Sequence, residues 1–442
     1  MRERLKDVIA EKGYNYITLA EEIGYSRQTL SAYIRGIRPM PYLVRAKLTK
    51  LLHVDVDALL EKERLQAKER KQVAEEARSY FDNDLTLQLQ AIAFKDLTFA
   101  ERLQRIARTL QRFSHISPEE RREALLRLIS FPFALEEGSM TTVKYGDYLM
   151  QTSTSIAACW KLVTSSQTKE DMLAAYNGAT AFLPSLVNIA EQSSEHRKQA
   201  LSLAAQCSLI KSFLSWHLQN LIEASANCEQ AYLYSNNAGD SVLVSCALDT
   251  QAWANYYSSK DKQALDAAEK TIPYMKAAEV PQMLRSGLQS ALCVMRARNG
   301  IISTDTYKQA IDSVDADMPA DQDYYTYSEI CTNGVLMYYE QQDYDTALKT
   351  GLQLINENDL QTKIPMTERE RVMILNYMAL SALKGKRRDR DRAVRFWEAA
   401  IQGARDLESE QRFRESITVY QIMDTLWKDK AIKELRELTR HW

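Results

Sequence analysis

A small residue recurs in the C-terminal half of this sequence, and it sets what the chain can fold into. Each time, an alanine followed by a branched aliphatic residue stands early in a segment with helical periodicity, just after a short polar turn. The recurrences are about 37 to 46 residues apart, a period typical of stacked helix–turn–helix units. The alanines are Ala264, Ala310, Ala347, Ala393 and Ala431, and Ala224 offers the same position without the aliphatic neighbour.

Alanine is expected at this position for a physical reason. A second helix can cross closely over a first only where the side chain at the crossing is small. Aromatic-rich segments such as QAWANYY and NGVLMYY stand where the first helix of a unit is expected. The whole chain of 442 residues holds 13 glycines and 9 prolines, so turns and breaks are scarce. Strong helix formers dominate, and the sequence predicts an all-α protein.

The stretch NGVLMYYEQQDYDTALKTGLQLI resembles the tetratricopeptide consensus in its register of small residue, tyrosines, Asp-Tyr and alanine. The resemblance implies that Tyr338 and Tyr344 fill the gap between neighbouring helix pairs. It also implies five or six such pairs from about residue 155 to 442, stacked as a right-handed α-solenoid with a concave surface. The segment WKDKAIKELRELTRHW is expected to cap the array.

The first sixty residues have a different pattern, that of five short helices. Gly13 ends the first helix, Asn15 caps the second, and a fourth is expected from about Tyr42 to Leu52. Between the second and third helices, Gly24 supplies the positive φ of a tight turn and Ser26 caps the helix that follows. Ala20 allows the close crossing, and the third helix buries Leu30, Tyr33, Ile34 and Ile37 by periodicity.

The residues on the outer face of the third helix are of the types that read DNA. Arginine pairs with guanine, glutamine with adenine, and a small apolar side chain meets a thymine methyl group, while further arginines hold phosphates. Lys47 and Lys50 are further candidates for the phosphate backbone. The predicted DNA-binding residues are Arg27, Gln28, Thr29, Ser31, Ala32, Arg35 and Arg38.

The segment LAEEIGYSRQTLSAYIRGIRPMP resembles the Xre-type helix-turn-helix of phage repressors and bacterial regulators over residues 1–60. The resemblance implies that Arg27, Gln28 and Ala32 meet bases in double-stranded DNA. Ile34 departs from it, since a polar or acidic residue is more usual there. Such domains act as homodimers on pseudo-palindromic operators.

Charge and composition suggest how the chain is divided. Residues 1–60 hold ten Lys or Arg and seven Asp or Glu, a net charge of +3, whereas the whole chain carries −2. The expected domains are a DNA-binding domain (1–60), a charged helical linker (61–83), a helical connecting region (84–149) with a loop near 134–149, and the repeat domain (150–442). The linker is either a solvated connecting helix or one that forms a dimer and transmits a signal.

An Xre-type head on a long repeat array resembles the peptide-pheromone receptor regulators of Gram-positive quorum sensing and the Xre–tetratricopeptide regulators of Bacillota and Chloroflexota. In the pheromone receptors, asparagines of first helices hold a short peptide in the concave groove. Asn255, Asn333 and Asn376 occupy similar positions, and an asparagine both donates and accepts, which suits a peptide or a small ligand. For any single one of them, an ordinary polar residue or a packing hydrogen bond is the favoured interpretation.

Other functions find little support in the sequence. No nucleotide-binding or hydrolase motif occurs, so no enzyme activity, metal or cofactor is expected. The six cysteines form no C-x-x-C pair and read as buried apolar residues of a reducing compartment. No run is long and apolar enough for a membrane span, and a cytoplasmic protein is expected. Two hypotheses remain: a ligand-sensing transcriptional regulator, or an interaction scaffold that binds a protein partner.

Overall fold

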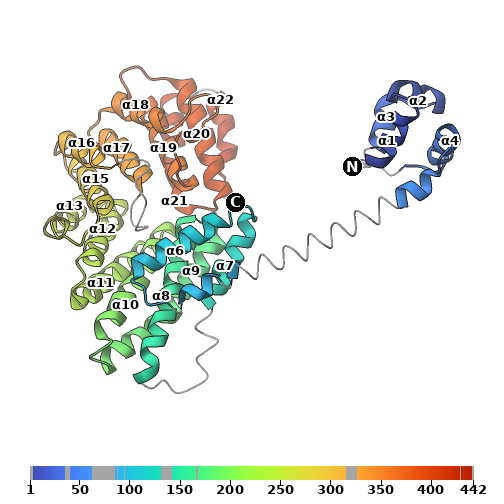
Figure 1. The fold of residues 1–442 in the computed structure, drawn as a ribbon. Coiled ribbons are helices and arrows are strands. Elements are labelled where there is room, and N and C mark those ends of the chain that lie inside the picture. The colour runs from blue at the N-terminus through green and yellow to red at the C-terminus, as the bar shows by residue number, and fades with distance from the viewer. Residues whose placement is uncertain are drawn as a thin grey trace. The chain divides into compact units, whose positions relative to one another are not determined.

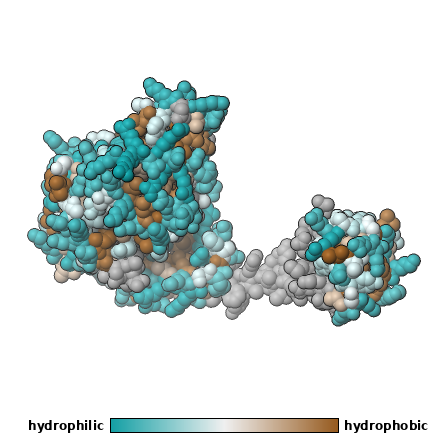
Figure 2. All heavy atoms as spheres, turned by 90° about the horizontal axis from the view of Figure 1, so that it is seen from above, coloured by the Kyte–Doolittle hydropathy of each residue, from teal (hydrophilic) through white to brown (hydrophobic). Residues whose placement is uncertain are grey.

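The computed structural model describes residues 3–34, 40–61, 85–86, 88–93, 95–130, 142–165, 168–314, 326–428 and 430–440. Within these ranges every regular element is helical, apart from one isolated bridge between Ile355 and Thr362, which confirms the all-α class. The chain forms two compact units, Met1–Asp84 and Leu85–Trp442 (Figure 1). Both present a mainly hydrophilic surface with scattered hydrophobic residues (Figure 2).

The first unit is built as its local sequence predicts. Asn15 accepts hydrogen bonds from the amides of Ile17 and Thr18 at 2.9 and 3.0 Å, which confirms the predicted cap. The sequence periodicity of the fourth helix predicts Val44, Leu48 and Leu51 on its inward face, but Leu51 is only partly buried and Leu52 beside it is fully buried, so the prediction is off by one residue there. Residues 56–61 are helical, after the helices α1 (Glu3–Glu11), α2 (Tyr16–Ile23), α3 (Arg27–Ile34) and α4 (Tyr42–Leu52).

The second unit begins with helices that pack on those that follow. Helix α8 starts at Thr142, so the loop expected near 134–149 is wrong from that residue on, and a boundary at 150 would cut a helix. Because α6 and α7 both contact α8, residues 85–130 belong to the same body as the later helices. These helices are α6 (Phe99–Arg112), α7 (Pro118–Ser130), α8 (Thr142–Ser165) and α9 (Lys169–Gln192).

From there the chain continues as antiparallel helix pairs. A first helix packs against a second, and that second helix packs against the first helix of the next pair. The first helices are α10 (Arg197–His217), α12 (Ser241–Tyr257), α15 (Gln282–Arg298), α17 (Tyr327–Glu340), α19 (Glu368–Lys384) and α21 (Glu410–Leu426). The second helices are α11 (Leu221–Ala238), α13 (Asp261–Glu269) with the short α14 (Ile272–Met275), α16 (Thr304–Asp312), α18 (Tyr344–Leu354), α20 (Arg390–Asp406) and α22 (Lys430–Glu434), with η2 (Leu435–Thr439) after it.

The recurring alanines stand where these pairs cross. Ala224, Ala264, Ala347 and Ala393 are each the fourth residue of a second helix, and each is at most 1% exposed. Ala431 is exposed and its neighbour Ile432 is buried instead, so the register expected there is wrong by one residue.

Helix α16 is the exception among the second helices. Its fourth residue is the buried Tyr307, and the buried Ala310 comes one turn later. Gly334 on α17 provides the room, because a Cβ at that position would overlap the Tyr307 hydroxyl and ring. A large residue on one helix is thus matched by the absence of a side chain on the other.

The first helices also contact one another in sequence, and the row turns back on itself. Each of α8, α10, α12, α15, α17 and α19 touches the next first helix along the chain, ending at α21. Helix α21 then contacts α10. Side chains on the inner side of this row, from both its beginning and its end, therefore face a common space.

We expect Gly334→Ala to destabilise the second unit by about 1–3 kcal/mol, because the added methyl group overpacks against Tyr307. Gly146→Ala is the matched control: it lies within α8, and its new methyl group would sit 3.7 Å from His196, an ordinary contact. That control should leave stability unchanged or raise it by up to ~1 kcal/mol. Thermal unfolding followed by circular dichroism compares the two, and equal midpoints would refute the close approach.

Candidate functional site

Helix α3 owes its position in the first unit to a tight turn and a cap. Gly24 has φ 76°, and its amide donates to the carbonyls of Ala20 and Glu21, which ends α2. The Ser26 hydroxyl accepts a hydrogen bond from the amide of Thr29 at 3.1 Å and so begins α3. Both features are as the sequence predicts, and they confirm that α2 and α3 are joined by a short turn.

One side of α3 is anchored in the core. Leu30 and Ile34 are fully buried, and the ring of Tyr33 lies edge-on to that of Tyr25, with 6.3 Å between their centroids. Lys47 on α4 donates to the carbonyl of Ile23 at 2.8 Å, so this lysine joins α4 to α2. Helix α3 is therefore held by its buried face and by the contact of Tyr33 with Tyr25, and Lys47 fixes the end of the preceding helix α2.

The predicted DNA-binding residues fall into three groups. Arg27 and Gln28 are exposed at the start of α3. Thr29 and Ser31 are partly buried, and the Thr29 hydroxyl lies 2.8 Å from that of Ser26. Ala32 lies on α3 but its side chain, with all of Arg35 and Arg38, is outside the described residues.

Three exposed apolar side chains of this unit were not predicted. Ile17 on α2 is 49% exposed, and Tyr42 and Leu43 at the start of α4 are 68% and 69% exposed. Tyr42 lies under the guanidinium group of Arg45, whose carbon is 6.0 Å from the ring centroid. Periodicity alone placed α4 correctly but gives no signal for apolar residues left in solvent.

The second unit holds a cavity of about 220 Å³ on the inner side of its row of first helices. Its walls come from both ends of the row: the C-terminal turns of α8 and α10 and most of the length of α12, and the first two turns of α17 and α19 with the first turn of α21. It is lined by Trp160, Val163, Thr164, Phe213, Trp216, His217, Cys246, Asp249, Thr250, Trp253, Tyr257, Thr326, Glu329, Thr332, Asn333, Thr367, Arg369, Glu370, Met373 and Arg412.

Aromatic rings form the wall contributed by α10 and α12. The rings of Trp216 and Trp253 are nearly parallel, with 8° between their planes and 6.4 Å between their centroids. Tyr257 lies 4.8 Å from Trp216, and Phe213 meets the same ring edge-on at 5.6 Å. Such a wall offers flat apolar surface to whatever enters the cavity.

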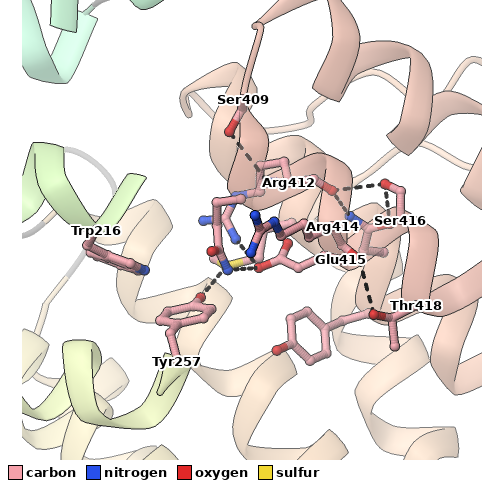
Figure 3. Close-up of polar contacts among 12 residues, drawn as sticks. Trp216, Tyr257, Ser409, Arg412, Arg414, Glu415, Ser416 and Thr418 are labelled. Carbon is pink, nitrogen blue, oxygen red and sulfur yellow. Dashed lines mark hydrogen bonds and ion pairs between the residues drawn. The ribbon is translucent and has the colours of Figure 1, made fainter. Parts of the chain in front are cut away.

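Opposite this wall lie two buried arginines. Arg412 on α21 pairs with Glu415, with 2.6 Å between Nη1 and Oε1 (Figure 3). Arg369 on α19 donates to the carbonyl of Val163 on α8 at 3.5 Å. Burial and the positive charge of Arg412 lower the pKa of Arg369 to about 10. The same two arginines, together with burial, hold the pKa of His217 well below its usual range, so this imidazole is neutral at pH 7.

Acidic residues line another part of the cavity. Glu329 and Glu370 are the third residues of α17 and α19, and each accepts hydrogen bonds from the amide and hydroxyl of a capping threonine, Thr326 or Thr367. Burial and the charges of Glu370 and Asp249 raise the pKa of Glu329 to about 8. Glu329 is therefore largely protonated at neutral pH.

Of the three asparagines predicted to hold a ligand, Asn333 lines the cavity, and its amide nitrogen donates to Ser290 at 2.9 Å. Asn376 is 1% exposed, accepts from Ser416 and donates to the carbonyl of Arg412. Asn255 is buried and does not contribute to the lining. The aromatic and arginine residues were missed, although Trp216 and Trp253 stand about one repeat length apart.

Other kinds of site are not found in the described parts of the chain. There, no three histidine, cysteine or acidic side chains come together as metal ligands would. All six cysteines are buried, as predicted, and burial raises the pKa of the Cys159 thiol to about 12. None of the described helices combines the length and apolar character that a membrane span requires. No protein-family model matches the sequence, and no curated protein gives a significant match.

Glu329 gives the second unit a pH-dependent stability. Its pKa is near 4.5 in the unfolded chain and about 8 in the folded one, so the folded state retains a proton that the unfolded state loses between these values. Stability therefore falls as pH rises from about 4.5 to 8. Glu329→Gln keeps the capping acceptor and removes the charge. The difference between its thermal midpoint and that of the parent should therefore shift in favour of the variant as pH rises from 5 to 8.5.

Glu101 provides the matched control, because it completes the same kind of capping box with Thr98. It is exposed, and the hydrogen bonds from Thr98 lower its pKa instead of raising it. Glu101→Gln should lower the midpoint equally at pH 5 and pH 8.5, with the loss fading only at more acidic pH. A Glu329→Gln effect that does not change over this pH range would refute the buried, protonated carboxyl group.

Proposed function

We propose that the protein is a sequence-specific DNA-binding transcriptional regulator whose second unit senses a ligand. The observation that carries the proposal is the exposure of Arg27 and Gln28 on the first turn of a helix that is capped by Ser26 and anchored by Leu30. These two side chains are long enough and polar enough to reach base edges in a major groove. No acidic residue lies in the first turn of α3 to repel phosphates.

The sensing part of the proposal is supported by the cavity. Its walls bring together helices from both ends of the row, so a molecule bound there contacts elements that are far apart in sequence. In this proposal the helix pairs form a right-handed solenoid of tetratricopeptide-like repeats, and the ligand is a short signalling peptide or a small molecule. Its binding rearranges a homodimer on a pseudo-palindromic operator.

Arg27→Ala and Gln28→Ala should each weaken binding to the selected operator by about 1–3 kcal/mol, with little change in binding to unrelated DNA. The operator is first obtained by selection from random duplexes with the full chain, and affinities are then measured by fluorescence anisotropy at fixed salt. Salt must be fixed because phosphate contacts make affinity depend steeply on it.

Arg45→Ala is the matched control, because it removes the same charge from the same unit. Arg45 is already paired with Asp57 at 2.7 Å, so its loss should affect operator and unrelated DNA alike. If Arg27→Ala and Gln28→Ala bind the operator as tightly as Arg45→Ala does, α3 does not read bases and the proposal fails. Selection that yields no DNA sequence, with one stoichiometric protein partner recovered, would favour the scaffold hypothesis instead.

A further inference from the structure

The cavity presents buried polar atoms without partners. Trp216 is 8% exposed, and its indole N–H finds no acceptor among the described residues. The Nε of Arg412 and the Nδ1 of His217 are likewise buried without a hydrogen bond within the described chain. Buried donors are nearly always paired in folded proteins, and an unpaired one destabilises the fold. Trp216 and His217 come from α10 and Arg412 from α21, so these atoms converge from opposite sides (Figure 3).

The electric field at this place favours a negative charge. Arg369 and Arg412 are close enough that the charge of Arg412 lowers the pKa of Arg369. Both stand in the first turns of their helices, where the helix dipoles add partial positive charge. An anion beside both arginines would relieve their repulsion, and a carboxylate has the planar pair of oxygens that a guanidinium group binds.

The acidic residues that line the cavity lie away from the arginines, although Glu415, behind the lining, pairs with Arg412 through its Oε1 at 2.6 Å. The raised pKa of Glu329 is caused by burial and by Glu370 and Asp249, whereas that of His217 is lowered by burial and by the two arginines. Glu370 is already engaged by the Thr367 amide and hydroxyl and by the Ser328 hydroxyl. The charged residues of the lining thus form two groups, and the acceptor oxygens of a ligand would belong with the arginines.

Size and shape limit the rest of the ligand. At about 220 Å³ the cavity is smaller than the roughly 300–1,000 Å³ that encloses a drug-sized molecule. It holds about seven waters at ~30 Å³ each, which corresponds to a molecule with on the order of ten heavy atoms. The rings of Trp216, Trp253 and Tyr257 offer this molecule a flat apolar wall.

We propose that this cavity binds a carboxylate carried on a small, flat apolar body, with the carboxylate held by the Trp216 indole N–H and the Arg412 and Arg369 guanidinium groups. The body lies against Trp216, Trp253 and Tyr257. This inference names the class of ligand for the sensing part of the proposed function. It rests on that function only for the role of the ligand in the cell, and not for the binding itself. The carboxylate belongs either to a free aromatic acid or to the C-terminal residue of a short peptide.

The experiment uses the full chain, without DNA, and four probes in titration calorimetry. Phenylacetate represents the free acid and N-acetylglycyl-phenylalanine the peptide terminus, and each is paired with its uncharged amide. At least one acid should bind at least about tenfold more tightly than its amide, because a buried hydrogen bond to a charged group is worth about 1.5–3 kcal/mol. Which acid binds identifies the source.

Two matched variants test the assigned donor. Trp216→Phe keeps an aromatic ring in the wall but removes the unpaired N–H, and it should weaken binding of the preferred acid about tenfold and leave its amide unchanged. Trp253→Phe makes the same substitution on the same wall, at a ring that is not assigned to the carboxylate. It should change both affinities about equally, by less than about threefold. Thermal unfolding midpoints confirm that both variants fold.

The proposal is overturned if neither acid binds at millimolar concentration, if acid and amide bind alike, or if Trp216→Phe and Trp253→Phe behave alike. Its failure can be told apart from failure of the regulator assignment, because Arg27→Ala tests DNA binding in the other unit. Acid binding that survives Arg27→Ala, with operator binding lost, would support both assignments independently.

Discussion

The structure of the second unit depends on the close crossing of the two helices within each pair. At four of these crossings, an alanine at the fourth position of the second helix is almost completely buried against the first helix. Small residues let helix axes approach until side chains on both sides interlock, and the interior is then packed as densely as a crystal. At a fifth crossing the small residue is on the first helix instead, because Tyr307 of the second helix enters the space that Gly334 leaves open. Because each crossing fixes one pair, the pairs together fix the direction of the row.

The direction of the row in turn creates the cavity. Had the row of first helices continued straight, the C-terminal turns of α8 and α10 would not meet the first turns of α19 and α21. The row instead turns until α10 touches α21, and Arg369 of α19 reaches the Val163 carbonyl of α8. Aromatic residues from the beginning of the row therefore face arginines from its end. A chemical environment of this kind requires no motif, only residues brought together by the curvature of many helices.

The difference between local helix crossings and the curvature of the whole row explains what could be predicted from the sequence. The helical class, the Asn15 and Ser26 caps, the Gly24 turn and four of the alanine crossings are local, since each depends on residues within a few turns of helix, and these are confirmed. The error at Ala431 and the misplaced loop before α8 are also local, and they show that periodicity locates element boundaries less well than element type. The convergence of Trp216 and Arg412 on one cavity depends on contacts between distant helices, for which periodicity gives only the buried face. The reading of DNA by Arg27 and Gln28 and the handedness of the helix array stay predictions.

The same curvature suggests how a ligand would act on the protein. The direct polar contacts between the two ends of the row differ in length. Tyr256 on α12 donates to Glu340 on α17 at 2.6 Å. Arg369 to Val163 and Arg414 to Gln219 both measure 3.5 Å, at the weak end of hydrogen bonding. Meanwhile the unpaired donors of Trp216 and Arg412 face each other across the space between these ends. A ligand that bonds both can do so only while α10 and α21 are close, so its binding energy favours that arrangement over any in which they separate. Sensing would then need no separate switch, because the site exists only when the row is closed.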